Sequence, residues 1–266
     1  MLEILGYIAA LFIGIALGLI GGGGSILTVP ILVYLLNIDP VPATAYSLFI
    51  VGLTALVGSF TYIKRKEISF STVFVFAVPS FMAVFLTRKF IVPAIPGELF
   101  QLGSFILTKD IFIMILFAAL MIAASVSMIK KSKFSPVDSV IKFNYPMIFF
   151  EGIAVGILTG LVGAGGGFLI IPALVILAKL PMKVAVGTSL LIIAVKSLIG
   201  FTGDIGTNLT VDWIFLFVIS GLSVIGIFFG SYFSKFISNE KLKPVFGYFV
   251  LVMGIYIITR EVYTSL

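Results

Sequence analysis

The sequence predicts an all-α polytopic membrane protein with two inverted-topology five-segment repeats, each of which contains a glycine-broken helical hairpin. Three observations predict this fold: an apolar composition, a series of ten apolar segments and an internal repeat. Of the 266 residues, 61% are hydrophobic and 11% are charged, whereas a soluble domain has about 25% charged residues. Apolar stretches long enough to cross a hydrocarbon layer of about 30 Å recur along the whole chain. We therefore expect a multi-pass protein of the cell (inner) membrane, surrounded by the lipid bilayer.

Ten apolar segments account for most of the chain. Two of them, residues 25–36 and 167–178, have only about 12 residues each, or about 18 Å of helix, which is too short for a full span. Each of these short segments follows a cluster of glycines. We therefore expect two hairpins that enter and leave the membrane on the same side. The ten segments lie near residues 2–20, 25–36, 43–63, 71–92, 111–129, 147–163, 167–178, 184–201, 213–234 and 245–259.

The basic residues predict which side of the membrane each connection faces. Most of the 17 Lys and Arg residues lie in four connections, and basic connections favour the cytoplasmic side. The connections at 37–42 and 202–212 contain none, so we expect both termini outside. Arg88 and Lys89 fall on the predicted outer side, where we expect their side chains to extend along the membrane edge to water. The four basic connections follow residues 63, 129, 178 and 234.

The chain contains an internal repeat at an offset of 142 residues, which aligns Gly14 with Gly156. Over residues 14–60, about 18 of roughly 47 positions are identical without a gap, which indicates a duplication. Each copy contains five segments, and an odd number of crossings inverts the second copy relative to the first. We predict a first transmembrane repeat at 1–129, a cytoplasmic linker at 130–146 and a second transmembrane repeat at 147–266.

The glycine clusters at the two helix breaks predict a binding site. Where a helix is broken inside a membrane, its freed backbone groups must line a cavity or pack against protein. Half-helices that begin at Ser25 and Gly167 would direct unpaired N–H groups and positive dipole ends into the protein. Inverted repeats with matching breaks are typical of secondary transporters, which bind substrate there. We therefore expect a small anion to be held by Gly22, Gly23, Gly24, Ser25, Gly165, Gly166 and Gly167.

Close helix packing is the alternative role for glycines in a membrane protein. Gly14 and Gly18, like Gly156 and Gly160, are spaced by four residues on a helix face, so we assign these four to packing. Consecutive glycines break a helix instead of decorating one face of it. We therefore favour the binding role for the two clusters.

Polar side chains inside the predicted spans add candidate ligands. A charge in a span is costly, so we expect Lys196 to be a counter-charge for the anion or a charge that a conformational change exposes; the alternative is that it extends to the membrane edge. Ser47, Ser189 and Thr188 lie about one turn into the following helices, where their hydroxyl groups can donate to the anion or to a neighbouring helix. Asp204, just beyond the helix of Lys196, is either solvated or paired with that lysine.

The glycine-rich motifs resemble those of a known family. "GGGGSILTVP" and "GAGGGFLIIP", followed by "ATAYSL" and "AVGTSL", are similar to the duplicated motifs of the TauE/SafE family of membrane permeases. The resemblance covers nearly the whole chain, including its length and two-copy layout. Family members are linked to export or uptake of sulfite, sulfoacetate and other small sulfur-containing anions. The first copy departs from the second at Ser25, which aligns with Gly167.

These observations together predict a secondary transporter of a small anion, which the resemblance specifies as a sulfur-containing one such as sulfite, sulfoacetate or a related organosulfonate. One half would rock against the other around the glycine breaks. A coupling ion, H⁺ or Na⁺, would use carboxylates such as Glu151 or Asp204, or unwound carbonyl groups that leave no mark in a sequence. An anion channel is the alternative within transport. The oligomeric state has no signature in the sequence.

The composition restricts the other function classes. The chain has no cysteine and no histidine, which excludes disulfides, thiolate nucleophiles, imidazole bases and the usual zinc and haem ligand sets. We expect no cofactor and no metal. The cytoplasmic connections account for the net charge of +6, so we expect no nucleic-acid partner. An intramembrane enzyme with Ser25 as nucleophile would have Lys196 as its one buried base, and we therefore predict that the protein is not an enzyme.

Overall fold

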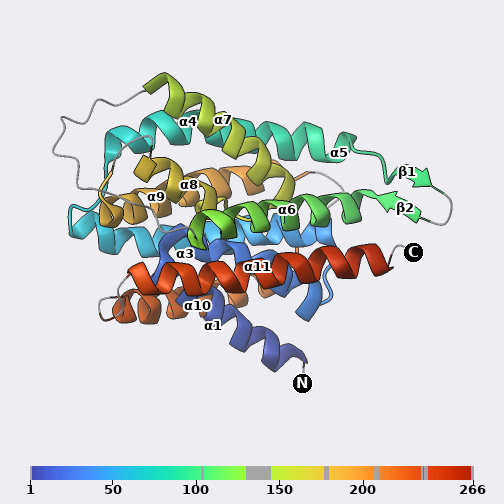
Figure 1. The fold of residues 1–266 in the computed structure, drawn as a ribbon, viewed down its shortest axis with the longest axis horizontal. Coiled ribbons are helices and arrows are strands. Elements are labelled where there is room, and N and C mark those ends of the chain that lie inside the picture. Colours follow the sequence, from blue (N-terminus) through green and yellow to red (C-terminus); the bar gives the residue numbers. More distant parts are fainter. Residues whose placement is uncertain are drawn as a thin grey trace.

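The protein is a bundle of long helices with a short strand pair at one end (Figure 1). The structure is a computed structural model that describes residues 2–102, 105–129, 145–176, 180–206, 210–234, 236 and 239–264. The predicted linker, residues 130–146, lies almost wholly outside these ranges. The elements are α1 (Leu2–Ile20), the 3₁₀ helix η1 (Gly21–Leu27), α2 (Thr28–Pro30), the π helix η2 (Ile31–Leu35), α3 (Pro40–Lys64), α4 (Phe70–Leu86), the π helix η3 (Thr87–Ile91), α5 (Val92–Ala94), β1 (Glu98–Leu102), β2 (Phe105–Thr108), α6 (Lys109–Ile129), α7 (Tyr145–Val162), α8 (Gly167–Ile176), α9 (Met182–Thr202), α10 (Trp213–Phe233) and α11 (Asn239–Thr264).

Seven helical runs among the described residues are long and apolar enough to cross a membrane. A shorter apolar helix spans Pro146–Val162, and each of the ten predicted apolar segments contains a helix. The predicted all-α membrane fold is therefore confirmed. The runs within α3 and α9 are the most buried of the seven, so the core lies between these two helices. The seven runs are Leu5–Leu35, Pro40–Lys64, Phe70–Ala94, Lys109–Ile129, Met182–Thr202, Trp213–Phe233 and Pro244–Tyr263.

The connection between α4 and α6 contains two strands, which the apolar pattern of the sequence does not predict. β1 and β2 pair antiparallel, with Glu98 opposite Thr108 and Leu102 opposite Phe105. Phenylalanine, leucine and isoleucine dominate both strands, and such side chains favour a pleated, half-buried surface. The hairpin projects from one end of the helix bundle (Figure 1).

The first glycine cluster folds the chain back on itself. Gly21 has a φ of +70°, a conformation that glycine adopts without strain. A Cβ on Gly24 would overlap the backbone of Leu17 in α1. At the far end of the hairpin, a Cβ on Gly6 would lie 2.5 Å from the side chain of Leu36. Residues before and after the break therefore run side by side, as a helical hairpin requires.

The second arm of this hairpin begins earlier than predicted. The helical backbone starts at Gly21 as a 3₁₀ helix and continues into α2 at Thr28, so the prediction of a start at Ser25 is wrong. A 3₁₀ helix eclipses the side chains at positions i and i+3, and a run of glycines has none to eclipse. The Ser25 hydroxyl adds to the tight turn by donating to the Gly22 carbonyl at 2.8 Å.

The second glycine cluster makes a similar reversal before α8. Gly163, Gly165 and Gly166 have φ values of +70°, +63° and +65°. A Cβ on Gly166 would lie 3.4 Å from Val155 of α7, so the break packs back onto the preceding helix. The α-helix after the break begins at Gly167, and the predicted start at this residue is confirmed.

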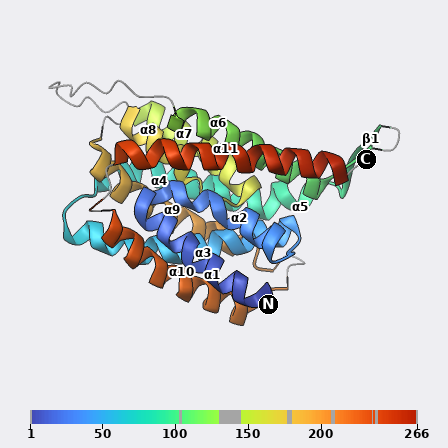
Figure 2. The same cartoon turned by 60° about the horizontal axis from the view of Figure 1, so that its bottom comes forward.

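The packing of the helices follows the internal repeat: each packed pair either has an equivalent pair in the other arrangement of the two halves or joins two equivalent helices. α1 packs on α10 and α7 packs on α4, whereas α3 packs on α9 and α6 on α11. Figures 1 and 2 both show α6 and α11 side by side. A Cβ on Gly14 would overlap the Ser223 carbonyl of α10, and a Cβ on Gly156 would lie 2.5 Å from the Ser80 carbonyl of α4. The packing role predicted for Gly14 and Gly156 is confirmed.

Candidate functional site

The two glycine breaks lie against each other in the protein interior. A Cβ on Gly167 would overlap the Gly22 carbonyl group, and a Cβ on Gly22 would lie 2.8 Å from Gly167 Cα. A Cβ on Gly165 would lie 3.2 Å from Ser25 Cβ. All four residues are buried. Because no side chain fits between them, the two backbones are in direct contact.

One face of α9 lies against the first break. The Cβ position of Gly21 is 2.7 Å from Val186 Cγ1, and that of Gly22 is 3.3 Å from the Ser189 hydroxyl oxygen. The Ser189 hydroxyl donates to the Val186 carbonyl at 2.8 Å. Ser189 therefore borders the break while its proton is held within its own helix.

The matching face of α3 lies against the second break. A Cβ on Gly163 would overlap Thr44, and a Cβ on Gly165 would lie 2.7 Å from Val51 Cγ1. Ser47 lies between Thr44 and Val51 at a spacing of three to four residues, which places all three on one helix face. The Ser47 hydroxyl is buried and has no hydrogen-bond partner in the described part of the chain. It is a donor available at this break.

Lys196 of α9 reaches the second break. Its side chain is fully buried, so it does not extend to the membrane edge. Its Nζ atom donates to the Thr159 hydroxyl of α7 at 2.9 Å and lies 2.7 Å from the Cβ position of Gly166. In the described residues, no carboxylate pairs with it. The amino group of Lys196 therefore lies against backbone that carries no side chain.

Three of the predicted ligands lie beside this site rather than in it. The Thr188 hydroxyl accepts a hydrogen bond from the Ser69 N–H at 3.0 Å, just before α4. The Cβ position of Gly23 is 3.0 Å from Ile20, and that of Gly24 overlaps the α1 backbone. The residues brought together are Gly22, Ser25, Ser47, Ser189, Gly165, Gly166, Gly167 and Lys196.

Arg88 lies inside the protein, and the prediction that it extends along the membrane edge is wrong. Its side chain is fully buried. It lies in the π turn η3, and π turns change the direction in which helix side chains point. Its Nη1 atom donates to the Thr44 hydroxyl at 2.9 Å and to the Gly160 carbonyl at 3.3 Å. Lys89, its neighbour in the chain, is exposed.

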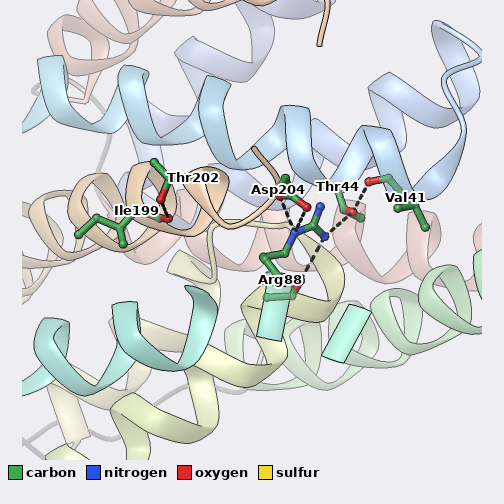
Figure 3. A network of polar contacts seen from close by, with 7 residues as sticks. Val41, Thr44, Arg88, Ile199, Thr202 and Asp204 are labelled. Carbon is green, nitrogen blue, oxygen red and sulfur yellow. Dashed lines mark hydrogen bonds and ion pairs between the residues drawn. The ribbon is translucent and has the colours of Figure 1, made fainter. Parts of the chain in front are cut away.

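Asp204 neutralises Arg88 and does not pair with Lys196. Arg88 Nε donates to the two carboxylate oxygens of Asp204 at 2.7 and 3.0 Å. Figure 3 shows the two side chains facing each other. Burial raises the pKa of the Asp204 carboxyl group, and the neighbouring guanidinium opposes this shift. The expectation that Asp204 is either solvated or paired with Lys196 is therefore wrong. The carboxylate that the sequence suggested as a partner of Lys196 is therefore bound to Arg88.

Lys196 is predicted from the sequence as a site residue, whereas Thr159 and Arg88 are not. Thr159 aligns with Leu17 of the first half, and a hydroxyl in the last turn before a glycine break is the signal that could have identified it. Arg88 lies near the end of an apolar segment, which suggests the membrane edge. No local sequence pattern predicts the π turn that directs the Arg88 side chain inward. The described residues contain no group of His, Cys, Asp or Glu that could hold a metal ion.

The chain is similar to known membrane proteins over nearly its full length. The family model described as "Sulfite exporter TauE/SafE" matches residues 6–257. A probable membrane transporter protein of Xylella fastidiosa (strain 9a5c) is 30% identical over 258 residues, covering 94% of this chain and 92% of the relative. The probable membrane transporter protein YunE of Bacillus subtilis (strain 168) is 27% identical over 282 residues, covering 99% and 98%. No solved structure shows a significant match.

The family match and the relatives agree with the multi-pass helical fold. The match covers both glycine breaks, α3, α9 and Lys196. The relatives are named as transporters and not as enzymes. The chain therefore belongs to the TauE/SafE family of multi-pass membrane transporters.

Proposed function

We propose that this protein is a secondary transporter of a small sulfur-containing anion, such as sulfite, sulfoacetate or a related organosulfonate. Transport occurs by alternating access between two inverted repeats. The description of the family supports the sulfur-containing class of the anion. The residues at the glycine breaks support its negative charge.

The position of Lys196 is the single observation that carries this proposal. Its Nζ atom is buried, donates to an uncharged hydroxyl and lies beside Gly166. A buried ammonium group is strongly unfavourable unless an opposite charge lies next to it. An anion at Gly166 supplies that charge, and Gly166 directly precedes the N-terminus of α8, where the helix dipole favours a negative charge.

The contact between the breaks supports alternating access. Gly22 touches Gly167, so an anion enters only when the two halves separate. The repeat aligns α1 with α7 and α4 with α10, so the packed pair α1 and α10 corresponds to the packed pair α7 and α4. The contact between α3 and α9 forms the seam between the two repeats. Such reciprocal packing is expected of two repeats related by a two-fold axis, and in an inverted arrangement rocking of one unit against the other would open the seam from either side.

Binding to the purified protein is the first test. Thermal shift and calorimetry would be run with sulfite, sulfoacetate, sulfate, acetate and chloride on wild type, Lys196→Ala and Lys89→Ala. We expect a small sulfur oxyanion to stabilise wild type and the exposed-lysine control Lys89→Ala, but not Lys196→Ala. Absence of any anion effect on wild type contradicts an anion site.

Transport into liposomes is the second test, and it distinguishes a carrier from a channel. A carrier shows saturable uptake, and substrate trapped inside the liposomes accelerates this uptake. A channel shows an anion conductance in planar bilayers, which we do not expect. A measured conductance, without acceleration of uptake by internal anion, overturns alternating access while leaving the anion site in place.

A further inference from the structure

The second repeat has an ionisable side chain, Lys196, at a position where the first repeat has none. The aligned residue in the first half is Thr54, whose hydroxyl donates to the Ile50 carbonyl at 2.6 Å within α3. Among the described residues, Lys196 is therefore the ionisable side chain beside the second break that no opposite charge pairs with, because Asp204 pairs with Arg88. Its charge state decides the charge of the whole site.

Among the residues that the structure describes, those packed around Lys196 offer it no fixed negative charge. η1, α4 and α8 pack against α9 and contain no ionisable side chain. On α3 the ionisable residues are Tyr46, Tyr62 and Lys64, none of which bonds Lys196. On α7, Glu151 precedes Thr159 by eight residues, or about 12 Å of helix.

The remaining charges near α7 belong to a separate pair. Arg88 approaches α7 at the Gly160 carbonyl, and Asp204 holds its Nε atom. These two charges neutralise each other, and neither bonds Lys196. The ammonium form of Lys196 is therefore favoured only while a mobile anion lies beside it, and the neutral amine is favoured when the site is empty and closed.

We propose that Lys196 binds a proton together with each anion, so that this protein couples anion transport to proton transport. This inference rests on the proposed function. When the site opens, the Nζ lone pair takes a proton from hydronium, and the anion binds next to the new ammonium group. The neutral pair crosses as the halves rock. On the other side the anion leaves, Nζ returns its proton to water, and the neutral amine keeps its hydrogen bond to Thr159.

Driven accumulation in liposomes tests this coupling. Purified protein would be reconstituted with equal external and internal isethionate, sulfoacetate or sulfite, and with the membrane potential clamped at zero by K⁺ and valinomycin. A pH one unit higher inside provides the only gradient. We expect the monovalent anion isethionate to accumulate about tenfold, because one pH unit is a tenfold proton gradient. A trapped pH dye should report one proton per anion, after correction with protein-free liposomes.

Two variants test whether Lys196 is the residue that carries the proton. Lys196→Arg carries a guanidinium that keeps its proton, so we expect it to exchange internal for external anion while losing the pH-driven accumulation. Lys89→Arg makes the same change at an exposed lysine and should behave as wild type. Size-exclusion profiles and melting temperatures check that both variants fold. If Lys196→Arg does not fold, the proton-to-anion ratio of wild type tests the coupling on its own.

The possible failures are distinguishable. Transport of any of the three anions with no proton movement overturns the inference and leaves the proposed function standing. Accumulation by Lys196→Arg equal to that of wild type also overturns it, because the proton then travels elsewhere. Failure of wild type to move all three anions overturns the proposed function and this inference together.

Discussion

Arg88 Nε lies 2.7 Å from one carboxylate oxygen of Asp204 and 3.0 Å from the other, and this ion pair joins η3, which continues α4, to the segment after α9. The same guanidinium donates to Thr44 on α3 and to Gly160 on α7. Four segments thus meet at one buried cation (Figure 3). Its Nη2 atom has no hydrogen-bond partner in the described part of the chain, so Asp204 provides the main compensation for its burial.

Asp204→Asn should strongly destabilise the protein. Removing one partner of a buried ion pair leaves an uncompensated charge, which costs about 3–5 kcal/mol. Thermal melting in detergent would measure the loss, with Asp39→Asn as control, because Asp39 is exposed and makes no side-chain cap. The double variant Arg88→Met with Asp204→Leu should recover much of the stability. A single variant that melts like wild type would show that the pair is unimportant for folding.

Thr159→Val should weaken anion binding without unfolding the protein. The change keeps the shape of the side chain but removes the hydroxyl that positions Lys196 Nζ at 2.9 Å. A hydrogen bond to a charged group contributes about 1.5–3 kcal/mol, so Kd should rise about tenfold or more. Calorimetry with the anion that stabilises wild type provides the measurement. Thr202→Val, an exposed threonine bonded only to Ile199 among the described residues, is the matched control and should leave Kd unchanged.

The helices were predictable from sequence because a bilayer demands long apolar runs, and such runs are an unambiguous signal. The meeting of Gly22 and Gly167 was also accessible, because the internal repeat aligns the two breaks. The position of Arg88 was not. Its burial depends on the π turn Thr87–Ile91 and on a carboxylate 116 residues away. A tertiary pairing of this kind overrides the local expectation that a cation near the end of a span reaches water.

Gly167→Ala should separate the two breaks and lower the stability. Its Cβ would overlap the Gly22 carbonyl, and both groups are backbone, so neither can move aside by changing a rotamer. Gly221→Ala is the control, because its Cβ would meet nothing within 4 Å and alanine favours a helix by about 1 kcal/mol. Melting temperatures should therefore shift in opposite directions. Equal melting of the two variants would mean that the contact between the breaks is not tight in the membrane.

Single cysteines can test the inversion of the second repeat directly, because the chain has no cysteine of its own. Arg65 lies in the connection after α3, and Ile205 lies in the corresponding connection after α9; both residues are exposed. Inverted repeats place these two connections on opposite faces of the membrane, with Arg65 on the cytoplasmic side because basic residues cluster there. A membrane-impermeant maleimide added to intact cells should label Ile205→Cys but not Arg65→Cys, and opened cells should label both. Labelling of both variants in intact cells would require the repeats to be parallel, and rocking about a shared seam would then no longer open the site to the two sides in turn.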